Sequence, residues 1–211
     1  MDIETAFLIV IALIASYLIG SIPTAYIMGR LRRSVDIRNI GSKNMGGMNV
    51  VYNVGVREGV LVIALDIGKG ALAVFITDLL GLSLIFLFIS GIVTVLGHNF
   101  SIFLGFRGGK GGAACIGILL YLIPWAVPAY AVLFVILLVT TRVPTISYSV
   151  AFICFPIIAW FVYRSLPLVI YTPVLLLMPG LMYIPRLKEM YHAGGDSWKR
   201  VFFRKDIKDR L

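Results

Sequence analysis

Residues 97–112, GHNFSIFLGFRGGKGG, form the most polar and glycine-dense stretch between two long apolar runs of the chain. The stretch contains His98, the cations Arg107 and Lys110, and the glycines Gly105, Gly108, Gly109, Gly111 and Gly112. Consecutive glycines that open into an apolar helix present backbone N–H groups, and a helix N-terminus favours an anion. We therefore predict a phosphate cradle at a membrane surface, made by Lys110 and the amides of residues 108–112. A flexible basic loop that binds lipid headgroups is the alternative.

His98 directly follows one of the apolar runs. It could act as a general base, or it could interact with the free carbonyls at the end of a helix. No carboxylate stands near His98 in the sequence to orient its ring, which slightly favours the structural role.

Two further polar runs contain glycine. The first, GSKNMGGMN, offers the hydrogen-bonding side chains of Ser42, Asn44 and Asn49, and its alternative interpretation is a turn that caps the next helix. The second, DIGKG, places Asp66 and Lys69 three residues apart, and therefore on one face of a helix. Ionisable groups inside a membrane span are costly and face a polar interior, so this pair is either a site or an ion pair that locks helices.

Several common kinds of site are excluded by spacing. The glycine-rich stretch does not fit the Walker A pattern, and the chain has no GxSxG, HExxH or CxxC motif. Cys115 and Cys154 each fall in an apolar run. We expect no metal site, no cofactor and no nucleic-acid partner.

The composition is that of an integral membrane protein. The chain has 211 residues, of which 60% are hydrophobic and 14% are charged, whereas soluble domains average about 45–50% apolar and 25% charged residues. The apolar runs lack the alternation of barrel strands. We predict an all-α polytopic membrane protein, with residues 1–211 forming a single domain.

Seven transmembrane helices are predicted, near residues 6–29, 59–79, 82–97, 111–124, 124–141, 145–163 and 166–184. Gly20 and Pro23 should kink or unwind the first helix near its inner end. The run 111–141 is too long for one span, and Pro124 and Pro128 indicate that it turns near residue 124.

Basic residues set the orientation. With seven spans, all Lys and Arg residues lie on one side except Lys69, inside a span, and Arg164, on the other side. The positive-inside rule then places the N-terminus outside the cell and the basic tail, residues 186–211, in the cytoplasm. The tail mixes aromatic residues with cations, so it is either an interfacial segment on anionic lipid or an exposed tail.

Taken together, these runs resemble the bacterial acyl-phosphate-dependent glycerol-3-phosphate acyltransferases, the membrane-integral PlsY type. The matching segments, in order, are SIP, DIRNIGSKNMGGMNV, LDIGKG and GHNFSIFLGFRGGKGGAA, at residues 21–23, 36–50, 65–70 and 97–114. The resemblance implies an enzyme of the cell membrane that begins phospholipid biosynthesis. Such an enzyme transfers a fatty acyl group from acyl phosphate to the 1-hydroxyl of glycerol 3-phosphate, giving lysophosphatidic acid and phosphate.

The resemblance also implies roles for particular residues, at an active site that faces the cytoplasm. The catalytic candidates are Ser42, His98 and Lys110. The substrate-binding candidates are Asn44, Asn49, Lys69, Arg107, Gly108, Gly109 and Gly111. Besides the two substrates, the expected partners of the protein are membrane lipids. The resemblance further implies that the substrate phosphate helps to remove the hydroxyl proton.

The chain departs from the family pattern at Met48, where a Thr is usual, and at Tyr52, where an Arg is usual. A third family motif, His-x-x-Asn-Ile, is missing after the last span. Two alternatives therefore stay open: a divergent relative with a different phosphorylated acceptor or no catalysis, and a transporter of organic phosphates.

Overall fold

The structure is a computed structural model that describes residues 2–193, apart from the side chains of residues 145, 186, 190 and 193. The described residues form α- and 3₁₀-helices joined by turns. Contacts divide the chain into two compact units, Met1–Leu122 and Ile123–Leu211. The single domain stays a prediction.

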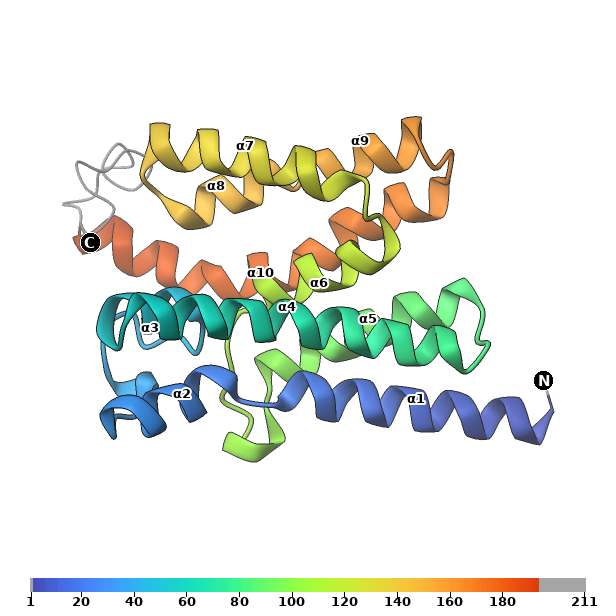
Figure 1. Cartoon of the computed structure of the whole chain (residues 1–211), viewed down its shortest axis with the longest axis horizontal. Coiled ribbons are helices and arrows are strands. Elements are labelled where there is room, and N and C mark those ends of the chain that lie inside the picture. Colours follow the sequence, from blue (N-terminus) through green and yellow to red (C-terminus); the bar gives the residue numbers. More distant parts are fainter. Residues whose placement is uncertain (1, 194–211) are drawn as a thin grey trace. The chain divides into compact units, whose positions relative to one another are not determined.

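Helices α1, α4 and α5 of the first unit pack lengthwise against one another, and α6 packs on α4 and α5 (Figure 1). Shorter helices connect α1 to α4 and α5 to α6. The elements of this unit are α1 (Ile3–Ser21), α2 (Thr24–Arg33), η1 (Ile37–Asn39), α3 (Gly47–Asn53), α4 (Val56–Leu79), α5 (Leu84–Asn99), η2 (Ile102–Leu104) and α6 (Gly112–Leu122).

The predicted break in the first apolar helix is confirmed. Helix α1 ends at Ser21 and α2 begins at Thr24, with Ile22 and Pro23 between them. Proline lacks a backbone N–H and cannot continue the helical hydrogen bonds. The break takes the carbonyl groups of Ser21 and Ile22 out of the regular helical hydrogen bonds. Ile22 O accepts from Thr24 N within the break, and both oxygens also accept from side chains of other elements.

Glycines bring the helices of the first unit into close contact. A side chain on Gly70 of α4 would collide with the backbone of Ala114 in α6, and one on Gly117 of α6 would collide with the backbone of Ile67 in α4. Small residues at helix interfaces in this way let backbones approach closely in a membrane.

An arginine–aspartate pair fixes the start of the connection between α2 and α4. The Arg38 guanidinium donates to both carboxylate oxygens of Asp36, at 2.7–3.2 Å. The guanidinium groups of Arg38 and Arg30 lie 5.2 and 5.3 Å from the centre of the Tyr26 ring in α2. These contacts tie η1 to α2 and hold the pKa of Asp36 below its ordinary value of 3.8, chiefly through the hydrogen bond from Arg38.

The second unit, within residues 123–193, is also helical. Tyr130 of α7 packs against Phe152 and Phe155, which lie between α8 and α9 and within α9. Its elements are α7 (Ala126–Thr141), α8 (Pro144–Ala151), α9 (Cys154–Phe161) and α10 (Leu166–Ala193). Helix α10 contains three prolines and runs nine residues beyond the predicted end at residue 184. Residues 194–211 of the predicted basic tail lie outside the described residues.

Four segments of the described chain are long and apolar enough to cross a membrane: Ile3–Arg33, Val56–Leu79, Leu84–Leu104 and Leu166–Glu189. Gly112–Leu122, Ala126–Thr141 and Ile146–Phe161 are shorter apolar segments. The predicted division of residues 111–141 is confirmed, because α6 ends at Leu122 and α7 begins at Ala126. The count of seven crossings stays a prediction.

We predict that Gly70→Val lowers the stability of the protein by about 1–3 kcal/mol, since the branched side chain has no room against Ala114. Thermal unfolding in detergent measures this effect. Gly68→Ala is the matched control on the same helix, because nothing lies within 4 Å of the position of its added carbon. Equal melting temperatures for Gly70→Val and Gly68→Ala would contradict the close packing of α4 on α6.

The Asp36–Arg38 pair predicts a pH dependence of stability. The folded pKa of Asp36 is depressed, so its contribution is complete above the ordinary value of 3.8 and is lost as the pH falls through the lower, folded value. Asp36→Asn should therefore melt below the wild type at pH 7, and the difference should shrink below about pH 4. Glu4→Gln, which removes an exposed carboxylate, is the control. A difference that stays constant with pH would refute the pairing.

Candidate functional site

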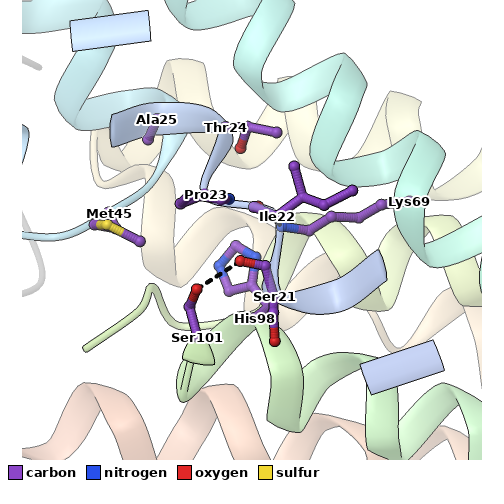
Figure 2. Close-up of a pocket in the computed structure, with 9 residues that line it drawn as sticks. All are labelled: Ser21, Ile22, Pro23, Thr24, Ala25, Met45, Lys69, His98 and Ser101. Atoms are coloured by element: carbon purple, nitrogen blue, oxygen red, sulfur yellow. Dashed lines mark hydrogen bonds between the residues drawn. The ribbon is translucent and has the colours of Figure 1, made fainter. Parts of the chain in front are cut away.

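A small pocket lies at the break between α1 and α2. Five consecutive residues line it, from the last residue of α1 to the second residue of α2, together with Lys69 of α4, His98 at the end of α5 and one residue from each neighbouring loop. The lining residues are Ser21, Ile22, Pro23, Thr24, Ala25, Lys69, His98, Met45 and Ser101 (Figure 2). The pocket thus gathers residues from, or next to, all three polar runs that the sequence singled out.

The released carbonyl groups of the break hold two side chains in place. Ile22 O accepts a hydrogen bond from Lys69 Nζ at 3.1 Å. Ser21 O accepts one from Ser101 Oγ at 2.6 Å, drawn as a dashed line in Figure 2. In an unbroken helix these oxygens would accept from the next turn instead. The break therefore positions both α4 and the loop after α5.

Lys69 is buried together with a counter-charge. Its ammonium lies 2.9 Å from Asp66 Oδ1, and the two side chains are 6% and 2% exposed. The same carboxylate oxygen accepts a hydrogen bond from Thr24 Oγ1 at 2.6 Å. The ion pair, one of the two interpretations of DIGKG, is present. Its lysine also lines the pocket.

His98 has the carboxylate neighbour that its sequence surroundings did not show. Its Nδ1 lies 3.9 Å from Asp66 Oδ1, so the argument against an orienting carboxylate was wrong. Asp66 belongs to another helix, and the spacing of residues around His98 in the sequence cannot show which residues of a neighbouring helix lie close to it. The Nε2 side of the ring faces the glycine loop, because a side chain on Gly109 would collide with that atom and with Met45 O.

Two of the predicted cradle amides already have acceptors. Gly108 N donates to Asn99 O at 2.9 Å, and Gly109 N donates to His98 O at 3.0 Å. The prediction that these two N–H groups hold a phosphate therefore differs from the structure, in which they fasten the loop to the end of α5. Gly111 has a φ of +85°, a conformation that glycine adopts readily, and α6 begins directly after it.

The GSKNMGGMN run is organised around the buried amide of Asn49. Its Nδ2 donates to the carbonyls of Ile37, Ile40 and Asn44 at 3.0–3.1 Å. Its Oδ1 accepts from Ser42 N and from Asn53 Nδ2. Asn49 was expected to bind substrate, but its hydrogen-bonding groups are occupied in holding the loop, because the loop's carbonyls lie outside any helix and need donors.

The predicted site residues fall into two groups. Lys69 and His98 line the pocket, whereas Ser42, Asn44, Arg107 and Lys110 are not among the residues that line it. Lys110 is half-buried just before α6, and Arg107 is exposed. The loops that carry these residues nevertheless reach the pocket through Met45 and through Gly109 at the face of His98.

Sequence reasoning missed four polar residues around the pocket: Ser21, Thr24, Ser101 and Asn99. In the described part of the chain, the buried side-chain atoms without a hydrogen-bond partner are Ser21 Oγ, His98 Nδ1 and both amide atoms of Asn99. Hydroxyl residues flanking the Pro23 break were a usable signal, since a broken membrane helix has to re-satisfy its backbone groups.

Comparisons with known proteins identify the family. The family described as glycerol-3-phosphate acyltransferase matches residues 10–191. Glycerol-3-phosphate acyltransferase 2 of Dehalococcoides mccartyi is 46% identical over 209 residues, covering 99% of this chain and 100% of the relative.

Two crystal structures of PlsY (YgiH), an integral membrane glycerol 3-phosphate acyltransferase, are similar to this chain over most of its length. The glycerol 3-phosphate form has a TM-score of 0.79 and 26% identity, covering 90% of this chain and 94% of that one. The lysophosphatidic acid form has a TM-score of 0.78 and 25% identity, covering 90% and 93%. The family match over residues 10–191 and the 46% identity to a relative over nearly the whole chain show that this chain belongs to the glycerol-3-phosphate acyltransferase family.

Proposed function

We propose that this protein transfers a fatty acyl group from acyl phosphate to the 1-hydroxyl of glycerol 3-phosphate, at the start of phospholipid biosynthesis. The observation that carries the proposal is the pocket in which Lys69 and His98 are buried side by side, in a chain of this family. The glycerol 3-phosphate and lysophosphatidic acid forms of PlsY support the acceptor and the product. The acyl phosphate donor rests on the resemblance of the sequence motifs.

The reaction asks little covalent chemistry of the protein. The 1-hydroxyl oxygen attacks the carbonyl carbon of the acyl phosphate, the bond from that carbon to the phosphate oxygen breaks, and phosphate leaves with the hydroxyl proton. Because acyl phosphate is already an activated mixed anhydride, binding two anions close together and stabilising the developing oxyanion supply most of the catalysis.

Residues in and beside the pocket fit that task. Lys69 supplies a fixed positive charge at the pocket wall, and Lys110 supplies one at the N-terminus of α6, where an anion is favoured. Ser42 and Asn44 lie on the loop that leads to Met45, from which their side chains would bind substrate phosphate or the acyl carbonyl. Asn49 shapes this loop, and Gly108 and Gly109 fasten the other.

A direct assay tests the proposal. Purified protein given acyl phosphate and glycerol 3-phosphate should release inorganic phosphate and form lysophosphatidic acid in equal amounts, and acyl-CoA should not replace the donor. Lys110→Ala should nearly abolish turnover, because one anchoring charge is lost. Arg164→Asn, which removes an exposed cation from a turn of the second unit, is the control and should keep full activity.

Three outcomes would each contradict part of this proposal. Turnover with another phosphorylated polyol but not with glycerol 3-phosphate would assign a different acceptor, in line with the departures at Met48 and Tyr52. No turnover with any phosphorylated polyol would make the chain a non-catalytic member of its family. Near-normal turnover of Lys110→Ala would remove the phosphate cradle at the α6 N-terminus.

We further propose that seven helices cross the cell membrane, with the site facing the cytoplasm. In a variant lacking Cys115 and Cys154, a cysteine at position 3 should react with an impermeant reagent in intact cells. A cysteine at position 205 should react only after permeabilisation, since basic segments stay in the cytoplasm. Labelling at both positions in intact cells would overturn this orientation.

A further inference from the structure

Asp66 is the one carboxylate, among the described residues, that faces both functional side chains of the pocket. Its Oδ1 lies 2.9 Å from Lys69 Nζ and 3.9 Å from His98 Nδ1, and it accepts the Thr24 hydroxyl at 2.6 Å. The residue is 1% exposed. It therefore meets groups from α2, α4 and the end of α5, three elements that are far apart in the sequence.

The ion pair is oriented with respect to the pocket. Lys69 lines the pocket, whereas Asp66 does not, so the ammonium stands at the wall and the carboxylate stands behind it. An ammonium without a counter-charge is very costly to bury. Asp66 supplies that counter-charge without occupying the place of a substrate anion.

The other contacts of the carboxylate limit where the ammonium can go. Thr24 is fixed at the first turn of α2, directly after the break, and its hydroxyl holds Oδ1. Ile22 O, between α1 and α2, accepts a hydrogen bond from the Lys69 ammonium. The Lys69 side chain is thus held at both the carboxylate and the carbonyl, and the His98 ring lies against the same oxygen.

We propose that Asp66, supported by Thr24, is a positioning residue for the acyl transfer: it holds the Lys69 ammonium at the pocket wall and keeps Nδ1 of His98 on its own side. The proposal rests on the proposed function, because it assigns the pocket to a phosphate-bearing substrate. It assigns a role to Asp66 beyond that of an ion pair that only ties helices together.

A double-mutant cycle distinguishes positioning from a structural tie. Asp66→Asn, Lys69→Met and the double variant are compared by kcat and KM for glycerol 3-phosphate and by melting temperature. If Asp66 acts through Lys69, Asp66→Asn should lower kcat/KM by about 30-fold or more in the wild type, since it leaves a buried charge unpaired. The same substitution should change kcat/KM by less than about threefold in the Lys69→Met background.

Two hydroxyl variants complete the test. Thr24→Val keeps both charges and removes only the hydrogen bond to Asp66, so it should lower kcat/KM by about 3- to 10-fold. Thr77→Val is the matched control, because Thr77 is a buried threonine of α4 whose hydroxyl bonds to Ala73 O within the helix. It should leave kcat/KM unchanged. If Asp66→Asn fails to fold, the Thr24→Val result against Thr77→Val decides the question.

The proposal would be overturned if Asp66→Asn lowered kcat/KM by the same factor with Lys69 present and in the Lys69→Met background. It would also be overturned if Asp66→Asn lowered the melting temperature and left kcat/KM unchanged. If the wild type turns over no substrate, the proposed function fails, and the positioning role is then read from the rise in melting temperature on adding glycerol 3-phosphate. That rise should be lost in Thr24→Val and kept in Thr77→Val. Equal rises in both would reject the role of Asp66.

Discussion

The backbone carbonyls released at Ile22 and Ser21 are the constraint on which the rest of the site depends. Pro23 stops the first helix inside its apolar segment, and a carbonyl at that depth has to find a new donor. Ile22 O accepts from Thr24 N and from Lys69 of α4, and Ser21 O accepts from Ser101 of the loop after α5. A local defect in one helix thereby fixes the positions of two other elements, and the pocket forms where they meet.

Close helix packing lets the short side chain of Ser101 reach the break. Gly97 of α5 lies against the backbone of Tyr17 and Ser21 in α1, with no room for a side chain. The backbone of α5 therefore comes near enough for the hydroxyl of Ser101, a few residues on, to bond to Ser21 O. In a membrane, where the hydrophobic effect does not drive helices together, this packing and these interhelical hydrogen bonds stabilise the assembly.

The two loops beside the pocket owe their shapes to internal hydrogen bonds. Asn49 satisfies the carbonyls of the first loop, and the amides of Gly108 and Gly109 fasten the second to the end of α5. A loop that already has its shape loses little entropy when a ligand binds. For the proposed reaction, in which two anions are held close together, such preorganised loops beside a paired, buried ammonium are a suitable arrangement.

The sequence by itself determined the membrane class, the break at Pro23, the division near residue 124 and the placing of Asp66 and Lys69 on one helix face, because composition, proline chemistry and helical spacing are local properties. Only the tertiary structure decided that Asp66 faces His98 and Thr24. It also decided that the side-chain amide of Asn49 hydrogen-bonds within its own loop, and that the backbone amides of Gly108 and Gly109 donate to the end of α5. These contacts depend on how far α1, α4 and α5 are rotated and shifted along one another. Close backbone contacts at glycines set that offset, and the spacing of residues along a single helix carries no record of it.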